Sequence, residues 1–409
     1  MIRGEVSAVP EALLHNYRAE LEQELHSILE YWNKYTLDTT NGGFYGSVSC
    51  NDIPDPNAMK GIVMHSRICW AFSVAYDYTR DEQHLLVATR AFEYIVHHFT
   101  DPEYGGVYWS VNAQGGMYDG KKQIYGQAFC IYALSEYYKI TANGMALHLA
   151  KDLFDYIEKY SFDPVKGGYI EALTREWKEA ADLRLSDKDN NERKTANTHL
   201  HIIEAYANLY QVWPSELLRE KIAAILDLFR LHMISREHDH LMLFFEENWQ
   251  SRSSLVSFGH DIEAAWLLPY CANIIGEEKS IQLYKPITLA MTGAALEGLD
   301  EKDGGLWYEY ESSTGKLIKE KHSWPQAEAM IGFFYAWQLS GEEVFLSRSL
   351  QSWRFIQKHI RDNKSGEWFW GVYEDHSIMQ KEKAGFWKCP YHNSRACLEL
   401  IRRITELTG

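Results

Sequence analysis

The sequence predicts an all-α protein, an (α/α)6 barrel of six inner and six outer helices with short β-hairpins or loops at one end. The first observation behind this prediction is a glycine–aromatic motif that recurs along the chain. Counted from Gly43, Gly106, Gly168, Leu241, Gly305 and Gly366, its six copies are 63, 62, 73, 64 and 61 residues apart. The second observation is a helical period of apolar residues between the copies. Because such a repeat defines one architecture, we expect residues 1–409 to form a single domain.

The glycine motifs predict the connections at one end of the barrel. Four copies contain a glycine pair: NGGFYG at 41–46, YGGVYW at 104–109, KGGYIEA at 166–172 and DGGLWYE at 303–309. A weaker copy, SGEWFWG, occupies 365–371, and HDHLMLFFEENW at 238–249 fills the remaining gap. Glycine next to aromatic and β-branched residues is typical of short hairpins. We expect each segment to link an outer helix to the next inner helix.

Two kinds of helical segment alternate between these motifs. Residues 12–35 and 342–360 are amphipathic and charged, as expected for outer helices with one solvated face. The inner set is almost wholly apolar, which predicts burial on most sides. Its six members are 66–78, 127–138, 199–210, 262–275, 326–339 and 395–404.

Every inner helix is entered from the same end, so polar and aromatic residues near the helix starts should meet at one mouth of the barrel. They are Arg67, Tyr125, Asn197, His201, His260, Glu263, Trp324, Glu328, Trp387 and His392. A ring of helix N-termini also favours negative charge that develops on a bound molecule. The sequence therefore predicts a funnel-shaped site at this mouth.

The net charge and the amino-acid composition limit the kinds of partner that we expect for the protein. The formal charge is −16, from 41 basic and 57 acidic side chains, which argues against a nucleic acid or an anionic membrane as partner. No run approaches the roughly 18 apolar residues of a membrane span, and the first residues lack the apolar core of a signal peptide. The six cysteines are scattered without a CxxC pair, which is typical of reduced thiols in a cytoplasm. We expect a cytoplasmic protein.

Motif searches give no support for a metal or cofactor. Although the chain has 17 histidines, no HExxH or Cys/His cluster occurs, and His199 and His201 point to different faces of their helix. GxGxxG, GxxxxGK[ST] and GxSxG are also absent, which disfavours a nucleotide site and a serine nucleophile. We expect no metal and no cofactor.

Carboxylates and histidines leave the chemistry open at this point. Asp261, Glu263 and Glu328 could serve a glycoside hydrolase, although Asp261 could instead cap its helix and Glu263 orient His260. His260 and His392 each begin an inner helix inside a polar cluster, FGHDIE and WKCPYHN. Two imidazoles facing one carbon could remove a proton from one side and return it on the other, as inversion next to a carbonyl requires. A non-catalytic sugar-binding barrel is a further alternative.

Several long motifs carry a resemblance that covers nearly the whole chain. They are MHSRICW (64–70), GGVYW (105–109), FCIYALSE (129–136), NTHLHIIEAYANLY (197–210), SFGHDIEAAWLL (257–268), WPQAEAMIGF (324–333) and GFWKCPYHNSRACLE (385–399). In these segments the sequence resembles the N-acylglucosamine 2-epimerase superfamily, and within it the cellobiose 2-epimerases.

The resemblance implies a sugar 2-epimerase that interconverts glucose and mannose units at the reducing end of β-1,4-disaccharides such as cellobiose, lactose or mannobiose. It implies ring opening, removal of the C2 proton to a cis-enediolate, and reprotonation from the other side. His260 and His392 would be the acid/base pair, and His201 would assist ring opening. The implied substrate-binding set is Arg67, Tyr125, Asn197, Glu263, Trp324, Glu328 and Trp387, with Glu263 orienting His260 and Glu328 lying behind the contact layer.

One departure bears on the substrate. Where the cellobiose enzymes carry two consecutive tryptophans, this chain reads HSWPQAEA, with Ser323 before Trp324. A mannose 2-epimerase acting on free mannose and glucose is therefore an alternative, as is an aldose–ketose isomerase of the same superfamily. The expected partner is a small saccharide, and the expected assembly is a monomer or a weak homodimer.

Overall fold

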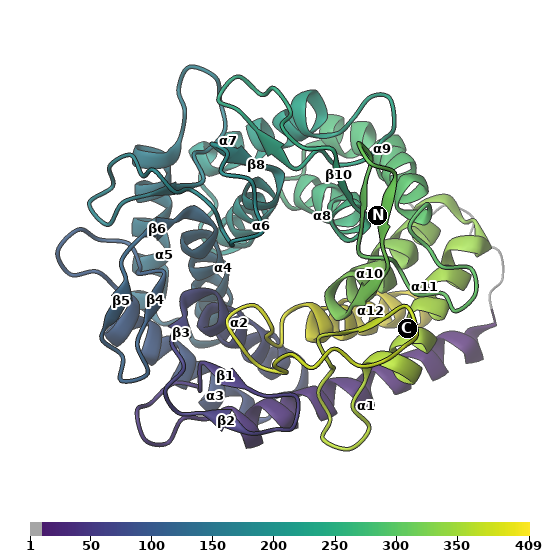
Figure 1. The fold of residues 1–409 in the computed structure, drawn as a ribbon, viewed down its shortest axis with the longest axis horizontal. Helices are drawn as coiled ribbons and strands as arrows, with labels where there is room; N and C mark the ends of the chain where they lie inside the picture. Colours follow the sequence, from purple (N-terminus) through teal and green to yellow (C-terminus); the bar gives the residue numbers. More distant parts are fainter. Residues whose placement is uncertain (1–9) are drawn as a thin grey trace.

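The computed structural model describes residues 10–409, and in this part of the chain twelve α-helices form a closed ring around one axis (Figure 1). The outer helices are α1 (Glu11–Tyr35), α3 (Glu82–Tyr94), α5 (Gly144–Tyr156), α7 (Glu216–Leu228), α9 (Glu278–Leu296) and α11 (Glu343–Phe355). The inner helices are α2 (Ile62–Thr79), α4 (Ile124–Thr141), α6 (Ala196–Val212), α8 (Phe258–Ile274), α10 (Ser323–Ser340) and α12 (His392–Thr408). The last inner helix packs against α1 and α2, which closes the ring. The predicted (α/α)6 barrel is confirmed.

Each inner helix begins three or four residues before its predicted range. For example, α8 begins at Phe258, whereas the apolar period begins at Ile262. In the inner helices other than α2, the first turn contains polar or aromatic residues near the mouth of the barrel, so the apolar period misses it. Four outer helices continue as π-helical turns, η1 (Ile95–Phe99), η2 (Ile157–Ser161), η3 (Phe229–Met233) and η4 (Ile356–Ile360), which completes the predicted 342–360 segment. No described helix is long and apolar enough to cross a bilayer.

The glycine–aromatic segments form the predicted hairpins in all six repeats. Each contains one equivalent antiparallel bridge: Leu37–Phe44, Thr100–Val107, Phe162–Tyr169, Ile234–Leu241, Leu299–Leu306 and Arg361–Trp368. The weak copies at 238–249 and 365–371 therefore belong to the same sixfold pattern. The hairpin forms in these two copies without a glycine pair because its bridge is made by backbone hydrogen bonds.

Short antiparallel strands join neighbouring repeats around the mouth. The strands are β1 (Ser47–Val48), β2 (Pro54–Asp55), β3 (Lys60–Gly61), β4 (Ser110–Val111), β5 (Met117–Asp119), β6 (Lys122–Gln123), β7 (Ala172–Leu173), β8 (Lys194–Thr195), β9 (Phe244–Phe245), β10 (Leu255–Ser257), β11 (Glu309–Glu311), β12 (Lys316–Ile318), β13 (Glu320–His322) and β14 (Gly371–Tyr373). A strand that precedes an inner helix pairs with a strand of the next repeat, as β6 does with β7 and β8 with β9. The bridge between Val48 and Ala384 closes this circle from the last repeat to the first.

In four inner helices, α4, α6, α8 and α10, a polar side chain in the first turn anchors the helix to its hairpin. His199 Nε2 accepts the Tyr169 N–H at 2.9 Å, and Gln326 Oε1 accepts the Leu306 N–H at 2.7 Å. Asp261 accepts the Leu241 N–H at 2.6 Å in the same way. Asp261 is therefore a structural anchor and not the N-cap of α8, which has no side-chain cap. These anchors fix the residues beside them at the mouth.

Five of the six repeats also contain a buried lysine that pairs with an aspartate of the hairpin. The pairs are Lys60–Asp38, Lys122–Asp101, Lys194–Asp163, Lys321–Asp300 and Lys383–Asp362. Repeat four has Ser235 and Val256 at the corresponding positions. There His240 Nδ1 donates to Asp261 at 2.8 Å instead.

Replacing Lys60 with methionine should lower the free energy of unfolding by about 3–5 kcal/mol, the usual effect of leaving one buried charge unpaired. Lys60 Nζ lies 2.7 Å from Asp38 Oδ2, and both side chains are at most 1% exposed. Urea denaturation should show the loss, whereas the exposed Lys364→Met should stay within about 0.5 kcal/mol of the parent. A loss below about 1 kcal/mol for Lys60→Met would contradict the structural role of these pairs.

Candidate active site

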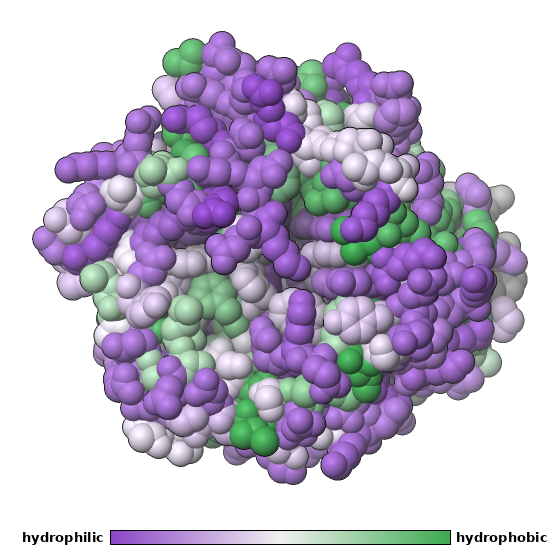
Figure 2. Space-filling view, in the orientation of Figure 1, coloured by the Kyte–Doolittle hydropathy of each residue, from purple (hydrophilic) through white to green (hydrophobic). Residues whose placement is uncertain are grey.

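The inner-helix N-termini surround a cavity of about 560 Å³ at one end of the barrel axis. Figure 2 shows a hollow near the middle of this face, among mainly hydrophilic residues. Nine of the ten site residues predicted from the sequence line the cavity: Arg67, Tyr125, Asn197, His201, His260, Glu263, Trp324, Trp387 and His392. Trp387 belongs to the loop before α12 and not to the helix itself. Glu328 is fully buried and lies behind the cavity wall.

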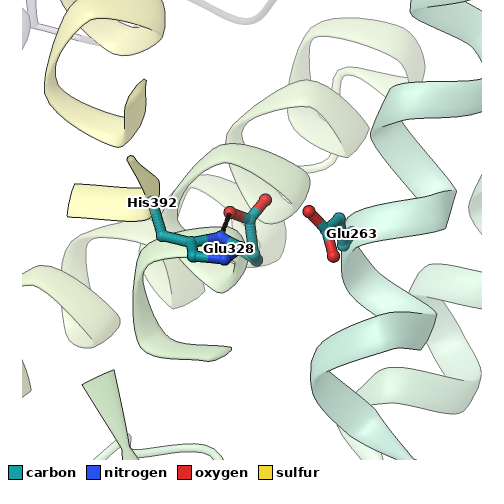
Figure 3. A group of neighbouring side chains, drawn as sticks. All are labelled: Glu263, Glu328 and His392. Atoms are coloured by element: carbon teal, nitrogen blue, oxygen red, sulfur yellow. Dashed lines mark hydrogen bonds and ion pairs between the residues drawn. The ribbon is translucent and has the colours of Figure 1, made fainter. Parts of the chain in front are cut away.

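His392 is held by the carboxylate of Glu328. Nδ1 of His392 lies 2.6 Å from Glu328 Oε1, a bond drawn in Figure 3. The same carboxylate accepts from Arg395 Nη2 at 2.7 Å and from Trp266 Nε1 at 3.0 Å. Donation from Nδ1 leaves the Nε2 lone pair of His392 free to accept a proton. Glu328 thus orients His392 and does not itself line the cavity.

Burial and two nearby guanidinium groups set the charge of His392. Burial lowers its pKa well below the ordinary value, and the positive charges of Arg67 and Arg395 lower it further. Its side chain is 16% exposed. The imidazole is therefore neutral at pH 7 and available as a base.

His260 also lines the cavity and lies next to the Trp324 indole. The ring centroids of His260 and Trp324 are 4.8 Å apart, and those of Trp324 and His392 are 5.5 Å apart. Nδ1 of His260 lies 2.8 Å from Ser257 Oγ. Burial, with a smaller effect of His201, lowers the pKa of His260 to about 4. The site thus contains a second neutral imidazole.

The expected contact between Glu263 and His260 is corrected by this geometry. Glu263 Oε1 accepts from Arg395 Nη2 at 2.7 Å, and the described partner of His260 is Ser257. Glu263 on α8 points toward Glu328 on the neighbouring inner helix α10 (Figure 3), and both carboxylates pair with the Arg395 guanidinium. Burial and the neighbouring Glu328 raise the pKa of Glu263 to about 8.

His201 forms a second imidazole–carboxylate pair. Its Nδ1 lies 2.9 Å from Glu204 Oε2. Although burial alone would raise the pKa of Glu204, Arg395 and His201 lower it to about 2. Glu204 is therefore ionised and fixes the His201 tautomer, as Glu328 does for His392.

Arg67 provides a buried cation on the cavity wall. Its Nη2 donates to the Tyr125 hydroxyl at 2.8 Å, and its guanidinium packs over the Phe129 ring at 4.2 Å. The Nε of Arg67 is buried without a hydrogen-bond partner. A cation with a spare donor in a dry wall can stabilise an oxyanion strongly.

Only one group of three His, Cys, Asp or Glu side chains among residues 10–409 has its ligand atoms close enough to share a metal ion. It consists of Glu263, Glu328 and His392, with ligand atoms within 4.8 Å of one another. Arg395 Nη2 already donates to both carboxylates, at 2.7 Å each. The Arg395 guanidinium therefore supplies, to both carboxylates, the positive charge that a metal ion would otherwise bring.

Several cavity residues were not predicted from the sequence. The loop before α6 contributes Arg184, Leu185, Ser186, Lys188, Asp189 and Asn190, and the neighbouring hairpins contribute Tyr308, Glu309, Trp368 and Trp370. The third and fourth copies of the glycine–aromatic motif are 73 residues apart, more than any other neighbouring pair of copies, and the additional residues form this loop. Arg395 and Glu204, which support the histidines, could not be predicted from the sequence. Both lie in buried inner helices, where no alternation of polar and apolar residues distinguishes a functional position.

Comparison with known proteins identifies the family. Residues 43–396 match the family model described as N-acylglucosamine 2-epimerase. The chain belongs to this epimerase family. The cellobiose 2-epimerase of Bacteroides fragilis is 45% identical over 386 residues, covering 94% of this chain and 98% of that protein.

Solved structures of family members have the same barrel. The cellobiose 2-epimerase of Spirochaeta thermophila superposes with a TM-score of 0.92 at 36% identity, covering 97% of this chain and 99% of that one. A D-mannose isomerase superposes with a TM-score of 0.83 at 21% identity, covering 94% and 97%, and shows the fold alone.

Proposed function

We propose that the chain is a cellobiose 2-epimerase, an isomerase that interconverts glucose and mannose units at the reducing end of β-1,4-disaccharides. The observation that carries the proposal is the pair of neutral imidazoles, His260 and His392, which both lie beside Trp324 in one cavity. The identity of 45% to an enzyme with this name supports the substrate class. A carboxylate-dependent hydrolase is disfavoured because Glu263 and Glu328 are both bound to Arg395.

The reaction begins with opening of the sugar ring, in which the O1 proton leaves and O5 gains one. His201, held by Glu204, assists this exchange. The free aldehyde at C1 makes the C2 proton more acidic. One neutral imidazole of the pair removes this proton, and the electron pair of the C–H bond moves toward O1 to give a cis-enediolate. Arg67 and the Tyr125 hydroxyl stabilise the negative charge on the enediolate oxygens.

Inversion follows from reprotonation on the opposite face. Rotation about C2–C3 presents the other face of C2 to the second imidazole, which takes up a proton from solvent as the enediolate forms and delivers it to C2. The first histidine releases the abstracted proton to solvent, so both imidazoles are neutral before and after the reaction. The negative enediolate favours the charged form of the donor. Asn197 binds sugar hydroxyls, and Trp324 and Trp387 stack against the sugar rings.

The acid limb of the kcat/KM profile should lie below pH 6.5, the ordinary pKa of histidine. Protonation of the base stops removal of the C2 proton. Because burial lowers the pKa of both His260 and His392, this protonation requires a lower pH than for a free imidazole. Initial rates with cellobiose between pH 4 and pH 9 test the prediction. An acid limb at or above pH 6.5 would show that neither histidine is the base in its buried state.

Ser323 favours a second candidate, a mannose 2-epimerase. Its side chain lines the cavity beside Trp324, and a serine cannot stack on a second sugar ring as the additional tryptophan of the cellobiose enzymes could. The deciding experiment compares kcat/KM for cellobiose and for free mannose in the same preparation, with products identified by NMR. A higher value for cellobiose supports the disaccharide enzyme, and a higher value for mannose supports the alternative. New reducing ends from cellobiose would indicate a hydrolase instead.

A further inference from the structure

The six inner helices contribute one equivalent residue each to a layer beneath the cavity. It lies two positions after a residue at an equivalent place in each helix, namely His65, Gln127, His199, Asp261, Gln326 and Asn393. The resulting set is Arg67, Phe129, His201, Glu263, Glu328 and Arg395. His201, Glu263 and Arg67 also reach the cavity, whereas Arg395 does not line it. The side chain of Arg395 is 1% exposed. No step of the proposed reaction uses this guanidinium, although it is among the largest fully buried side chains.

Arg395 joins carboxylates from three inner helices. Its Nη1 donates to Glu204 Oε1 on α6 at 2.5 Å, and its Nη2 donates to Glu263 on α8 and Glu328 on α10 at 2.7 Å each. Nη1 also donates to the hydroxyl of Tyr391. A planar guanidinium can bind several carboxylates in fixed directions at once, which a lysine ammonium cannot do.

Two of these three carboxylates each hold one of the three imidazoles of the site. Glu204 accepts from Nδ1 of His201 at 2.9 Å, and Glu328 accepts from Nδ1 of His392 at 2.6 Å. Arg395 is therefore connected to the His201 ring through Glu204 and to the His392 ring through Glu328. A carboxylate behind a histidine fixes its tautomer and ring orientation, and loss of such support typically costs about 10–100-fold in activity.

The three carboxylates do not carry equal charge. Glu328 accepts hydrogen bonds from His392, Trp266 and Arg395, whereas the described partner of Glu263 is Arg395. Three donors favour the ionised form of Glu328, and the proton that burial favours therefore resides on Glu263.

We propose that Arg395 is a positioning residue of the epimerase site: it keeps Glu204 and Glu328 ionised and in place, and through them fixes the tautomers of His201 and His392. This inference rests on the proposed function. Without the guanidinium, the pKa of Glu328 rises, and a protonated Glu328 no longer accepts the Nδ1–H of His392. The loss of positive charge also raises the pKa of His392. Because activity requires an ionised Glu328 and a neutral His392, a higher pKa of either group moves the acid limb of the activity profile to higher pH.

The test compares Arg395→Lys and Arg395→Met with Arg403→Met, which removes another buried arginine of α12. Arg403 bonds Gln338 and Glu399, outside the site. For Arg395→Met we expect kcat for cellobiose to fall about 10–100-fold, KM to change by less than about threefold, and the acid limb to rise by about one pH unit. Arg395→Lys should fold and show the same changes in smaller degree, because an ammonium cannot span the carboxylates. Arg403→Met should leave the acid limb unmoved.

A measurement that needs no turnover accompanies the kinetics. Nitrogen-15 NMR of histidine-labelled protein should show the Nδ1–H tautomer for His201 and His392 in the parent, and a mixed state for His392 in the Arg395 variants. If Arg395→Lys is folded and retains the parent kcat, acid limb and tautomers, the inference is overturned. A parent protein that makes no mannose unit contradicts the proposed function, whereas the tautomers in the same samples still test the role of Arg395.

Discussion

Replacement of His392 with asparagine is expected to lower kcat for cellobiose epimerisation by at least about 10²-fold, the usual loss when a general acid or base is removed. The side chain is held by Glu328 at 2.6 Å and lines the cavity, so no other group of α12 can take its place. Asparagine retains a polar side chain of similar reach but cannot exchange a proton at C2. The variant should still bind the disaccharide with a KM within about threefold of the parent, since Trp324 and Trp387, which we propose stack against the sugar rings, are unchanged.

The measurement is the initial rate of formation of the mannose-containing product by NMR, with His148→Asn as the matched control. His148 is 77% exposed on α5, far from the cavity in sequence and structure, and its replacement should leave the rate within about twofold of the parent. If His392→Asn keeps near-full activity, His392 is not part of the acid/base pair.

Replacement of His260 with asparagine should give a loss of the same size, at least about 10²-fold, for the same reason. The two variants should nevertheless differ in the proton that they exchange. Each retains one imidazole, and each imidazole faces one side of C2. One variant should therefore exchange the C2 proton of the glucose epimer with solvent, and the other variant that of the mannose epimer.

Deuterium exchange at C2 distinguishes these cases. Each variant is incubated in D2O separately with cellobiose and with its mannose epimer, and loss of the C2 proton signal is followed by NMR. Exchange of opposite epimers by the two variants supports a two-histidine mechanism. Exchange of the same epimer by both variants, or full epimerisation by either, would indicate a different base.

The fold could be predicted from the sequence because the repeat and the helical period are properties of the chain itself. The copy at 238–249 was found by spacing alone, and the bridge between Ile234 and Leu241 confirms it. The helix starts were less accurate. Residues such as Phe258 and Gly259 begin α8, but the turn that faces the cavity does not follow the apolar period.

The shared location of His260 and His392 also followed from the repeat, because both residues precede the anchor position of their helices by one residue. The partners of the site residues did not follow. Glu263 and His260 share a face of α8 by spacing, yet Glu263 bonds Arg395 on α12. Contacts between inner helices depend on the side chains that meet across the barrel axis, and spacing along one helix carries no information about them.

Removal and return of the C2 proton by the two cavity histidines, His260 and His392, is the central proposal. It is tested most directly by incubation of the parent protein with cellobiose in D2O, followed by NMR of the isolated product. The account predicts a disaccharide with mannose at its reducing end and deuterium at C2 of that unit. An epimerised product that keeps its original C2 proton, or recovery of cellobiose unchanged and without deuterium, would contradict it.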